Sequence, residues 1–218
     1  WRPTIQSRFG CDQRPSSAGR VCLWRGVSGG FFVCAINCVT CREAERTETF
    51  RAREPDQVMT LPPIRRIAVF CGSSDGTDPR FLAAATPLGY DLATRGIGVV
   101  YGGAHVGCMG ALADGALRAG GEVLGVLTRG LADREIAHHG ISGLELVDSM
   151  HERKARMAAL SDAVIALPGG YGTFDELFEA LTLVQTRKVA SLPIVLFGEE
   201  YWRRVINFDA LVEEGTID

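Results

Sequence analysis

From Arg65 to the end of the chain, short apolar runs alternate with longer segments whose apolar residues recur at helical spacing. The apolar runs lack the polar alternation of a half-exposed strand, so each predicts a strand buried on both faces, as in a parallel sheet. The predicted strands span residues 67–70, 98–101, 123–127, 144–147, 162–167 and 193–197.

The segments between these strands read as helices. Proline suits the first turn of a helix, so Pro79 predicts a helix over 79–95, and Gly120-Gly121 ends a second helix that passes through 110–119. Further helices are expected over the segment that begins near Arg153, after Thr173, and over 202–213. This alternation predicts an α/β fold with a single Rossmann-like doubly wound parallel sheet and helices on both faces.

Glycines follow three of the predicted strands, within residues 71–74, 102–110 and 169–172. In open parallel sheets, ligands bind at the edge formed by the carboxyl ends of the strands. The sequence therefore predicts a ligand site built from these three loops.

Residues 1–60 differ from the rest of the chain. They have mixed charge and no sustained apolar period, and the first methionine of the chain, Met59, lies just before the first predicted strand. We expect residues 1–60 to be a disordered or spurious extension and residues 61–218 to form the functional domain.

Five of the seven cysteines lie in this first segment. The spacing of Cys34, Cys38 and Cys41 resembles the iron–sulfur triad of radical S-adenosylmethionine enzymes, since three thiolates can hold a cluster or zinc. No barrel-length series of βα units follows, so we expect no metal here.

Composition excludes several classes of protein. The chain of 218 residues is 46% hydrophobic and 22% charged, which is ordinary for a globular protein. A net charge of −3 provides no basic surface for nucleic acid, and no apolar run approaches the roughly 20 residues that span a bilayer. We expect a cytoplasmic protein without nucleic-acid or membrane partners.

The most informative segment is Pro168-Gly169-Gly170-Tyr171-Gly172-Thr173-Phe174-Asp175-Glu176, which joins a predicted strand to a predicted helix. Thr173 lies where a helix N-cap is expected, and a helix N-terminus behind a glycine turn presents free N–H groups to an anion such as phosphate. Glu176 adds a carboxylate at the rim. The alternative is a tight turn that binds nothing.

A second segment, Met150-His151-Glu152-Arg153-Lys154, opens the helix before that strand. In a parallel sheet this helix begins at the ligand edge, so Arg153 and Glu176 can face one another across one site. The guanidinium offers a planar fork of donors to phosphate or ribose oxygens. The alternative is a solvated helix face.

Together, these two segments are similar to the LOG (Lonely Guy) family of cytokinin riboside 5′-monophosphate phosphoribohydrolases, long labelled as possible lysine decarboxylases. Two further strings match: Ile67-Ala68-Val69-Phe70-Cys71-Gly72-Ser73-Ser74, and Val99-Val100-Tyr101-Gly102-Gly103 with Val106-Gly107-Cys108-Met109-Gly110. The resemblance extends from about Arg65 to the end, where the family continues with a final strand and helix, so we expect the domain to be truncated there.

The resemblance implies hydrolysis of the N-glycosidic bond of an N6-modified adenosine 5′-monophosphate by a homodimer, with no metal or cofactor. Arg153 and Glu176 would be catalytic. The implied substrate-binding residues are Ser73, Gly102, Gly103, Met150, Lys154, Gly169, Gly170, Tyr171, Gly172 and Thr173.

The chain departs from the family pattern in the second glycine loop. Ala104 replaces a third glycine, His105 a serine and Cys108 a leucine. Alanine adopts a positive φ less readily than glycine, so these changes bear on loop shape and base preference. His105 either touches the base or ribose or has no role, whereas His138 and His139 are expected to be surface loop residues and Cys71 and Cys108 to be packing residues.

Two other functions stay open. A non-catalytic protein that binds a nucleotide or molybdenum cofactor would share the fold and a glycine loop but lack the arginine–glutamate pair. An AMP nucleosidase indifferent to N6 groups would share the pair.

Overall fold

The computed structural model describes residues 11–12, 22–25, 31–34, 63–76, 78–132, 136–190 and 192–217. A six-stranded sheet with the order β7-β6-β5-β4-β8-β9 forms the centre, and every neighbouring pair of strands in it is parallel. This confirms the predicted fold class. Its strands are β4 (Arg66–Phe70), β5 (Gly98–Tyr101), β6 (Val123–Thr128), β7 (Gly143–Val147), β8 (Ala163–Ala166) and β9 (Ile194–Leu196).

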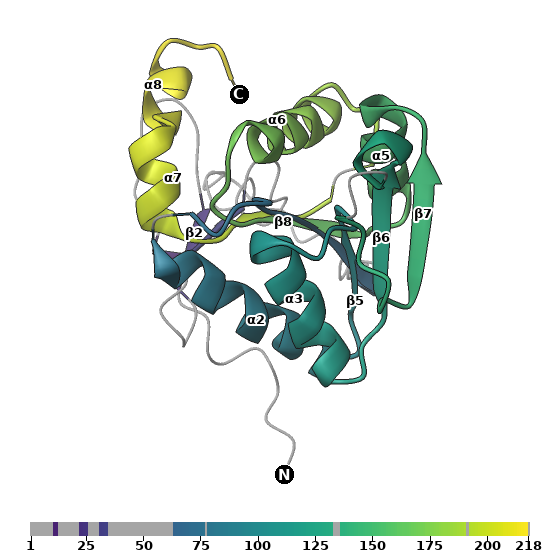
Figure 1. The fold of residues 1–218 in the computed structure, drawn as a ribbon. Coiled ribbons are helices and arrows are strands. Elements are labelled where there is room, and N and C mark those ends of the chain that lie inside the picture. Colours follow the sequence, from purple (N-terminus) through teal and green to yellow (C-terminus); the bar gives the residue numbers. More distant parts are fainter. Residues whose placement is uncertain are drawn as a thin grey trace, which may run out of the picture.

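Helices cover both faces of this sheet, with α2 and α3 on one face and α5 and α6 on the other (Figure 1). Alternate residues of a strand point to opposite faces, so Val69 packs with the α2–α3 layer and Phe70 with the α5–α6 layer. The helices of the domain are α2 (Pro79–Thr94), α3 (Gly107–Arg118), α4 (Arg129–Ala132), α5 (Met150–Ala159), α6 (Tyr171–Gln185), α7 (Glu199–Val205) and α8 (Phe208–Glu213).

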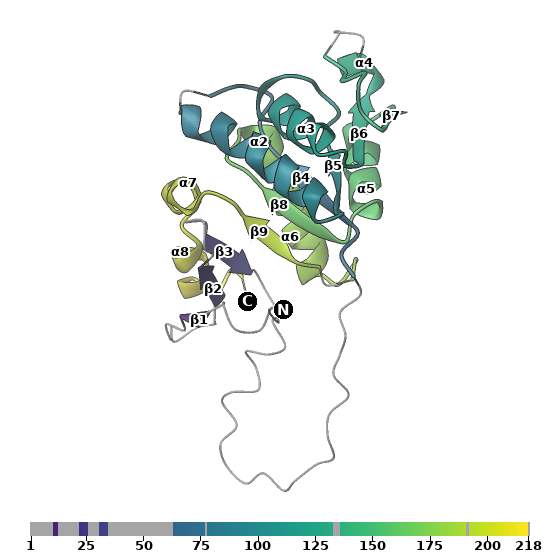
Figure 2. The same ribbon diagram turned by 90° about the horizontal axis from the view of Figure 1, so that it is seen from below.

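Helices α2 and α3 lie side by side (Figure 2) and touch through their backbones at two glycines. A Cβ added to Gly89 would lie 2.1 Å from the carbonyl oxygen of Leu112, and one added to Gly115 would lie 2.1 Å from that of Thr86. Side chains at these positions would force the helices apart, so the two glycines set how closely this layer packs.

The predicted single helix over 202–213 is wrong, because the chain breaks there into α7 and α8. Ile206 is extended, with φ −132° and ψ 122°. The Asn207 side chain accepts a hydrogen bond of 3.0 Å from the N–H of Ala210 and so caps a new helix. Asparagine is a common N-cap residue, but the apolar spacing on both sides of Asn207 predicted one continuous helix.

Three short strands precede the domain: β1 (Cys11–Asp12), β2 (Cys22–Arg25) and β3 (Phe31–Cys34). They form a separate antiparallel sheet in the order β1-β2-β3. Of the cysteine triad noted in the sequence, Cys38 and Cys41 lie outside the described residues, so the expectation of no metal there stays a prediction.

We expect Gly89→Ala to lower the free energy of unfolding by about 1–3 kcal/mol, because the new methyl group collides with the α3 backbone. The measurement is urea denaturation followed by circular dichroism. Gly130→Ala in α4 is the control, since a Cβ there meets nothing within 4 Å, and it should unfold at the wild-type midpoint or slightly above it. Equal midpoints for the two variants would contradict the close contact.

Candidate active site

The site lies where the chain reverses its winding direction. Strands β4 and β8 are neighbours, but α2 leaves β4 toward one face of the sheet and α6 leaves β8 toward the other (Figure 1). The loops that follow them meet, since a Cβ on Gly169 would lie 3.1 Å from the backbone nitrogen of Gly72. Such a topological switch point is where open α/β sheets bind ligands.

Helix α6 begins at Tyr171 with Gly170 as an extended N-cap that makes no side-chain capping bond. The N–H groups of its first turn are therefore free of a side-chain cap and can bind an anion. The prediction of Thr173 as N-cap is wrong. Thr173 lies inside the first turn, buried, because the extended Gly170 starts the helix earlier and the Thr173 hydroxyl packs against Gly169.

Helix α5 starts at a fixed residue because of its capping side chains. The Ser149 hydroxyl accepts a bond of 3.1 Å from the N–H of Glu152, and the Glu152 carboxylate accepts one of 3.0 Å from the N–H of Asp148. This reciprocal arrangement resembles a capping box. It holds Arg153, the next residue, in the first turn of α5 and directed at the edge of the sheet.

The Arg153 side chain joins three elements of the fold. Its Nη1 donates to Glu176 Oε1 at 2.6 Å, and its Nε donates to the carbonyl oxygen of Val126 in β6 at 2.9 Å. Gly102, at the end of β5, makes room for Nη2, because a Cβ there would lie 2.3 Å from it. The structure thus brings together Arg153, Glu176 and Gly102 from among the expected site residues.

This ion pair is buried, with Arg153 and Glu176 each only 7% exposed. Burial raises the pKa of the Glu176 carboxyl, and the adjacent Arg153 guanidinium opposes that rise. A carboxyl group with a raised pKa at a ligand edge suits general acid–base chemistry near neutral pH.

The second glycine loop is shaped by two glycines that need a positive φ, Gly103 at 78° and Gly107 at 60°. Ala104 is not among the residues with positive φ and instead forms an antiparallel bridge with Ala137. The exchange of glycine for alanine is therefore accommodated without backbone strain. Gly107 packs on Ser73, with a Cβ there only 2.6 Å from the Ser73 carbonyl oxygen, so Ser73 lies at the junction of the first and second loops.

Other expected site residues lie further from this pair. Lys154 turns to the flank of α6, where its ammonium group pairs with Asp175 at 2.9 Å and with Glu179. Gly103 packs toward β6. Met150 and Tyr171 are 42% and 94% exposed at the rim, where a ligand or a second chain can reach them.

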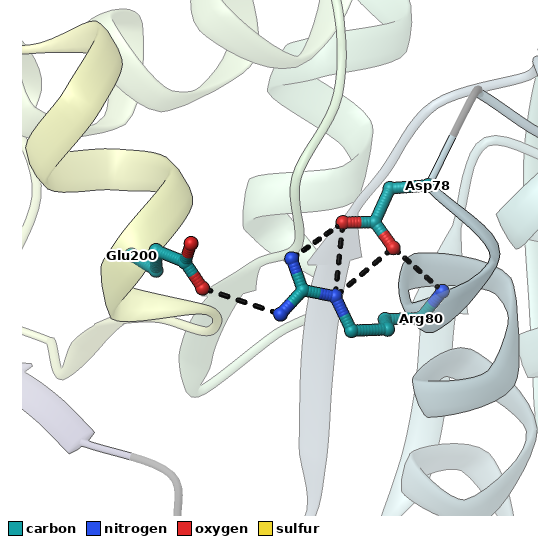
Figure 3. Close-up of polar contacts among 3 residues, drawn as sticks. All are labelled: Asp78, Arg80 and Glu200. Atoms are coloured by element: carbon teal, nitrogen blue, oxygen red, sulfur yellow. Dashed lines mark hydrogen bonds and ion pairs between the residues drawn. The ribbon is translucent and has the colours of Figure 1, made fainter.

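Helix α7 supports the glycine loop through residues that the sequence did not single out. The Tyr201 hydroxyl donates to the carbonyl oxygen of Gly169 at 2.5 Å. Figure 3 shows Arg80, at the start of α2, held by Asp78 and reaching Glu200 of α7 at 3.3 Å. Arg80 lowers the pKa of Asp78, but such exposed ion pairs contribute little stability. No local pattern marks the contact of Tyr201 with Gly169 or that of Arg80 with Glu200, because each joins segments far apart in the sequence.

Cys71 and Cys108 are buried in the core between the sheet and the α2–α3 layer. Burial raises the pKa of both thiols, which disfavours the nucleophilic thiolate. They are packing residues, as expected. His139 is exposed, whereas His138 is partly buried and hydrogen-bonded, which corrects its expected place among surface residues.

Within the described part of the chain, no three His, Cys, Asp or Glu side chains gather as metal ligands do. Its helices include none long and apolar enough to cross a membrane.

Most of the domain is similar in sequence to proteins of one known family. The model of a family described as "Possible lysine decarboxylase" matches residues 109–218. The cytokinin riboside 5′-monophosphate phosphoribohydrolases LOG1 and LOG7 of Arabidopsis thaliana are 43% and 44% identical to this chain, over 70% and 72% of it and over 72% and 73% of their own lengths. "Probable cytokinin riboside 5′-monophosphate phosphoribohydrolase LOGL5" of Oryza sativa subsp. japonica is 43% identical over 72% of this chain, which spans 65% of that relative.

Solved structures share the fold at lower identity. The molybdenum cofactor carrier protein of Chlamydomonas reinhardtii is 28% identical with a TM-score of 0.53, over 67% of this chain and 85% of its own. A molybdenum cofactor binding protein from the phototrophic bacterium Rippkaea orientalis is 26% identical with a TM-score of 0.53, over 68% and 85%.

We expect Arg153→Ala to destabilise the fold by about 3–5 kcal/mol at pH 7, because it leaves the Glu176 carboxylate buried without a partner. The loss should shrink as the pH falls toward roughly 4.5, where the carboxyl group protonates in the folded and unfolded chain alike. Urea unfolding at several pH values measures this dependence.

Arg129→Ala is the matched control, since Arg129 pairs with Asp148 on the surface at 61% and 80% exposure of their side chains. It should change stability by less than about 1 kcal/mol at every pH. A pH-independent loss in Arg153→Ala would show that lost packing, not an unpaired carboxylate, dominates.

Proposed function

Because the chain belongs to the LOG family of cytokinin riboside 5′-monophosphate phosphoribohydrolases, we propose that it hydrolyses the N-glycosidic bond of N6-modified adenosine 5′-monophosphates. The products are the free base and ribose 5-phosphate. The observation that carries the proposal is the buried contact between Arg153 and Glu176 beside an uncapped helix N-terminus.

The geometry suggests how the nucleotide lies. The 5′-phosphate binds the first-turn N–H groups of α6, from Tyr171 to Thr173, where the helix dipole also favours negative charge. Glu176 lies one turn further along the same helix, so the ribose ring extends from the phosphate toward its carboxylate. Ser73 and Gly72 border the phosphate from the first loop.

Glu176 then acts on the reacting carbon. Breaking the bond between C1′ and the base nitrogen builds positive charge on the ribose, as in other glycoside hydrolyses. The carboxylate stabilises that charge and takes a proton from the water that attacks C1′, while the base leaves with the bonding electrons. The leaving nitrogen takes up a proton from solvent and Glu176 returns one to solvent, so the reaction as a whole consumes one water. Arg153 orients the carboxylate and can bind ribose hydroxyl oxygens.

A second candidate is a non-catalytic carrier. The two structural relatives above carry or bind molybdenum cofactor, and this chain shares their fold at 26–28% identity. A buried carboxylate facing the ligand edge is of use to a hydrolase, whereas a carrier of a phosphate-bearing ligand gains nothing from it. Release of free base from N6-isopentenyl-AMP, with AMP as the comparison, separates the two candidates and also an AMP nucleosidase.

We further propose that the active form is a homodimer. The outer face of α6 carries a shallow groove lined by Phe174, Asp175, Phe178, Glu179, Thr182 and Leu183. Phe178 is 41% exposed and stacks on Phe174 with ring centroids 6.4 Å apart. This groove lies on the side of α6 that faces away from the sheet, and a second copy of the chain could bury its apolar residues.

The catalytic unit we propose is residues 61–218. A cytoplasmic location and the lack of a nucleic-acid partner are proposals that rest on composition and on the net charge of −3.

Glu176→Gln should keep the fold and lower kcat about 10²–10³-fold, because the amide can neither accept the proton nor neutralise the oxocarbenium charge. Base release from N6-isopentenyl-AMP is followed by chromatography. In the wild-type enzyme, kcat/KM should fall as the pH drops through the raised pKa of Glu176, so this acid limb should lie above the ordinary carboxyl value of about 4.3.

The substrate phosphate also titrates, so a thiophosphate analogue, which is the stronger acid, serves as the control. If the acid limb of the kcat/KM profile shifts to lower pH with the analogue, the substrate phosphate is the titrating group. If the limb lies at the same pH with both substrates, the titrating group is on the enzyme. Full activity in Glu176→Gln would remove this residue from the mechanism.

Light scattering should show a dimer at micromolar concentration for the wild-type chain and a monomer with little activity for Phe178→Asp, because a new charge in the groove adds to Asp175 and Glu179 and cannot be buried. Tyr90→Asp is the control, since Tyr90 is a 49% exposed aromatic residue on α2, across the sheet. A fully active wild-type monomer would contradict the dimer proposal.

A further inference from the structure

The second glycine loop is fastened to a segment of the chain that follows α4. His105 donates its backbone N–H to the carbonyl oxygen of Ile136, and His138 donates its own to that of Gly103, both at 2.9 Å. Ala104 and Ala137 pair between these bonds. The loop therefore has a fixed backbone at the position where the chain departs from the family pattern.

The imidazole of His105 is oriented by the same segment. Its Nδ1 lies 3.0 Å from the carbonyl oxygen of Ile136. A carbonyl oxygen can only accept, so the neutral ring carries its hydrogen on Nδ1 and leaves a lone pair on Nε2. From the other side, α3 locks the residue in place, since a Cβ on Gly110 would lie 2.0 Å from the His105 carbonyl oxygen. The side chain is exposed, so a ligand can reach Nε2.

The order of groups along the ligand edge indicates which part of a nucleotide reaches this loop. The phosphate-binding end of α6 comes first, then Glu176, then Arg153, whose Nη2 abuts Gly102 at the start of the second glycine loop. In a nucleoside 5′-monophosphate the phosphate and the base project from opposite ends of the ribose. With the phosphate on α6 and C1′ at Glu176, the base extends toward the start of this loop, residues 102–105.

We propose that His105 determines the base specificity of the reaction by accepting, through Nε2, a hydrogen bond from the exocyclic amino group of a 6-aminopurine. This inference rests on the proposed hydrolysis of adenosine monophosphates. An N6-alkylated adenine keeps one N6–H and can still donate. A 6-oxopurine presents an acceptor oxygen at that place, which would face the Nε2 lone pair with no hydrogen between them.

The expected discrimination follows from hydrogen-bond energetics. A site that binds an N–H group rejects the analogue that lacks it, because the acceptor in the site is left unpaired. For one neutral hydrogen bond at a partly open site, we expect His105 to raise the AMP/IMP ratio of kcat/KM by about 10- to 100-fold.

The test compares AMP and IMP with the full chain as the enzyme. His105→Ala should reduce the AMP/IMP ratio of kcat/KM at least about tenfold. His105→Gln should also lower the AMP/IMP ratio, by raising kcat/KM for IMP, because a glutamine amide can turn to donate to the oxygen of a 6-oxopurine. His139→Ala is the matched control, an exposed histidine outside the proposed site, and should keep the wild-type ratio. If His105→Ala is active and keeps the wild-type AMP/IMP ratio, the inference about His105 is overturned while the proposed reaction stands.

A binding measurement separates this inference from the proposed reaction. Calorimetry of AMP and IMP with Glu176→Gln, with and without His105→Ala, reports discrimination without turnover. If the wild-type chain releases no base but prefers AMP through His105, the inference stands and the proposed reaction fails. If Glu176→Gln binds AMP and IMP equally, or if His105→Ala retains the preference for AMP, the inference fails.

Discussion

The buried ion pair between Arg153 and Glu176 is the constraint to which the rest of the ligand edge conforms. Removing two charges from water costs several kcal/mol per ion, and their attraction repays this only with good geometry and further hydrogen bonds. Here the donor–acceptor distance is 2.6 Å, and the carbonyl oxygen of Val126 takes a second donor of the guanidinium. The pair thereby fixes α5, α6 and β6 relative to one another.

This ion pair explains why glycines, which have no side chain, occupy key positions in the loops around it. Gly102 leaves the space that the guanidinium occupies, and Gly169 lets the Thr173 hydroxyl and the backbone of Gly72 approach. A larger residue at position 102 would displace the guanidinium that holds the Glu176 carboxylate, and one at position 169 would displace the Thr173 hydroxyl and the Gly72 backbone. Close packing alone therefore accounts for the absence of a side chain at Gly102 and Gly169.

Much of the fold could be predicted from the sequence, because buried parallel strands and amphipathic helices leave local patterns. The start of α6 and the break at Ile206 were mispredicted, since Thr173 and the apolar spacing gave signals that the backbone overrode. The facing of Arg153 and Glu176 followed from topology. The contacts of Tyr201 with Gly169, and of Ile136 and His138 with the second glycine loop, did not, because each joins segments about 30 residues apart that share no motif.

The placement of Glu176 distinguishes between the two kinds of ligand site that this fold supports. A carboxylate near the end of α6 at which we propose that the phosphate binds would repel that phosphate, and its burial is itself unfavourable, as the raised pKa of Glu176 indicates. For binding alone, an apolar or amide side chain would be better at this position. The carboxylate becomes favourable when positive charge develops next to it, as it does on ribose when a glycosidic bond breaks. Before the reaction, Arg153 stabilises the buried carboxylate by pairing with it and so favours its ionised form. The negative charge then lies at the edge of the sheet where the positive charge on ribose would develop.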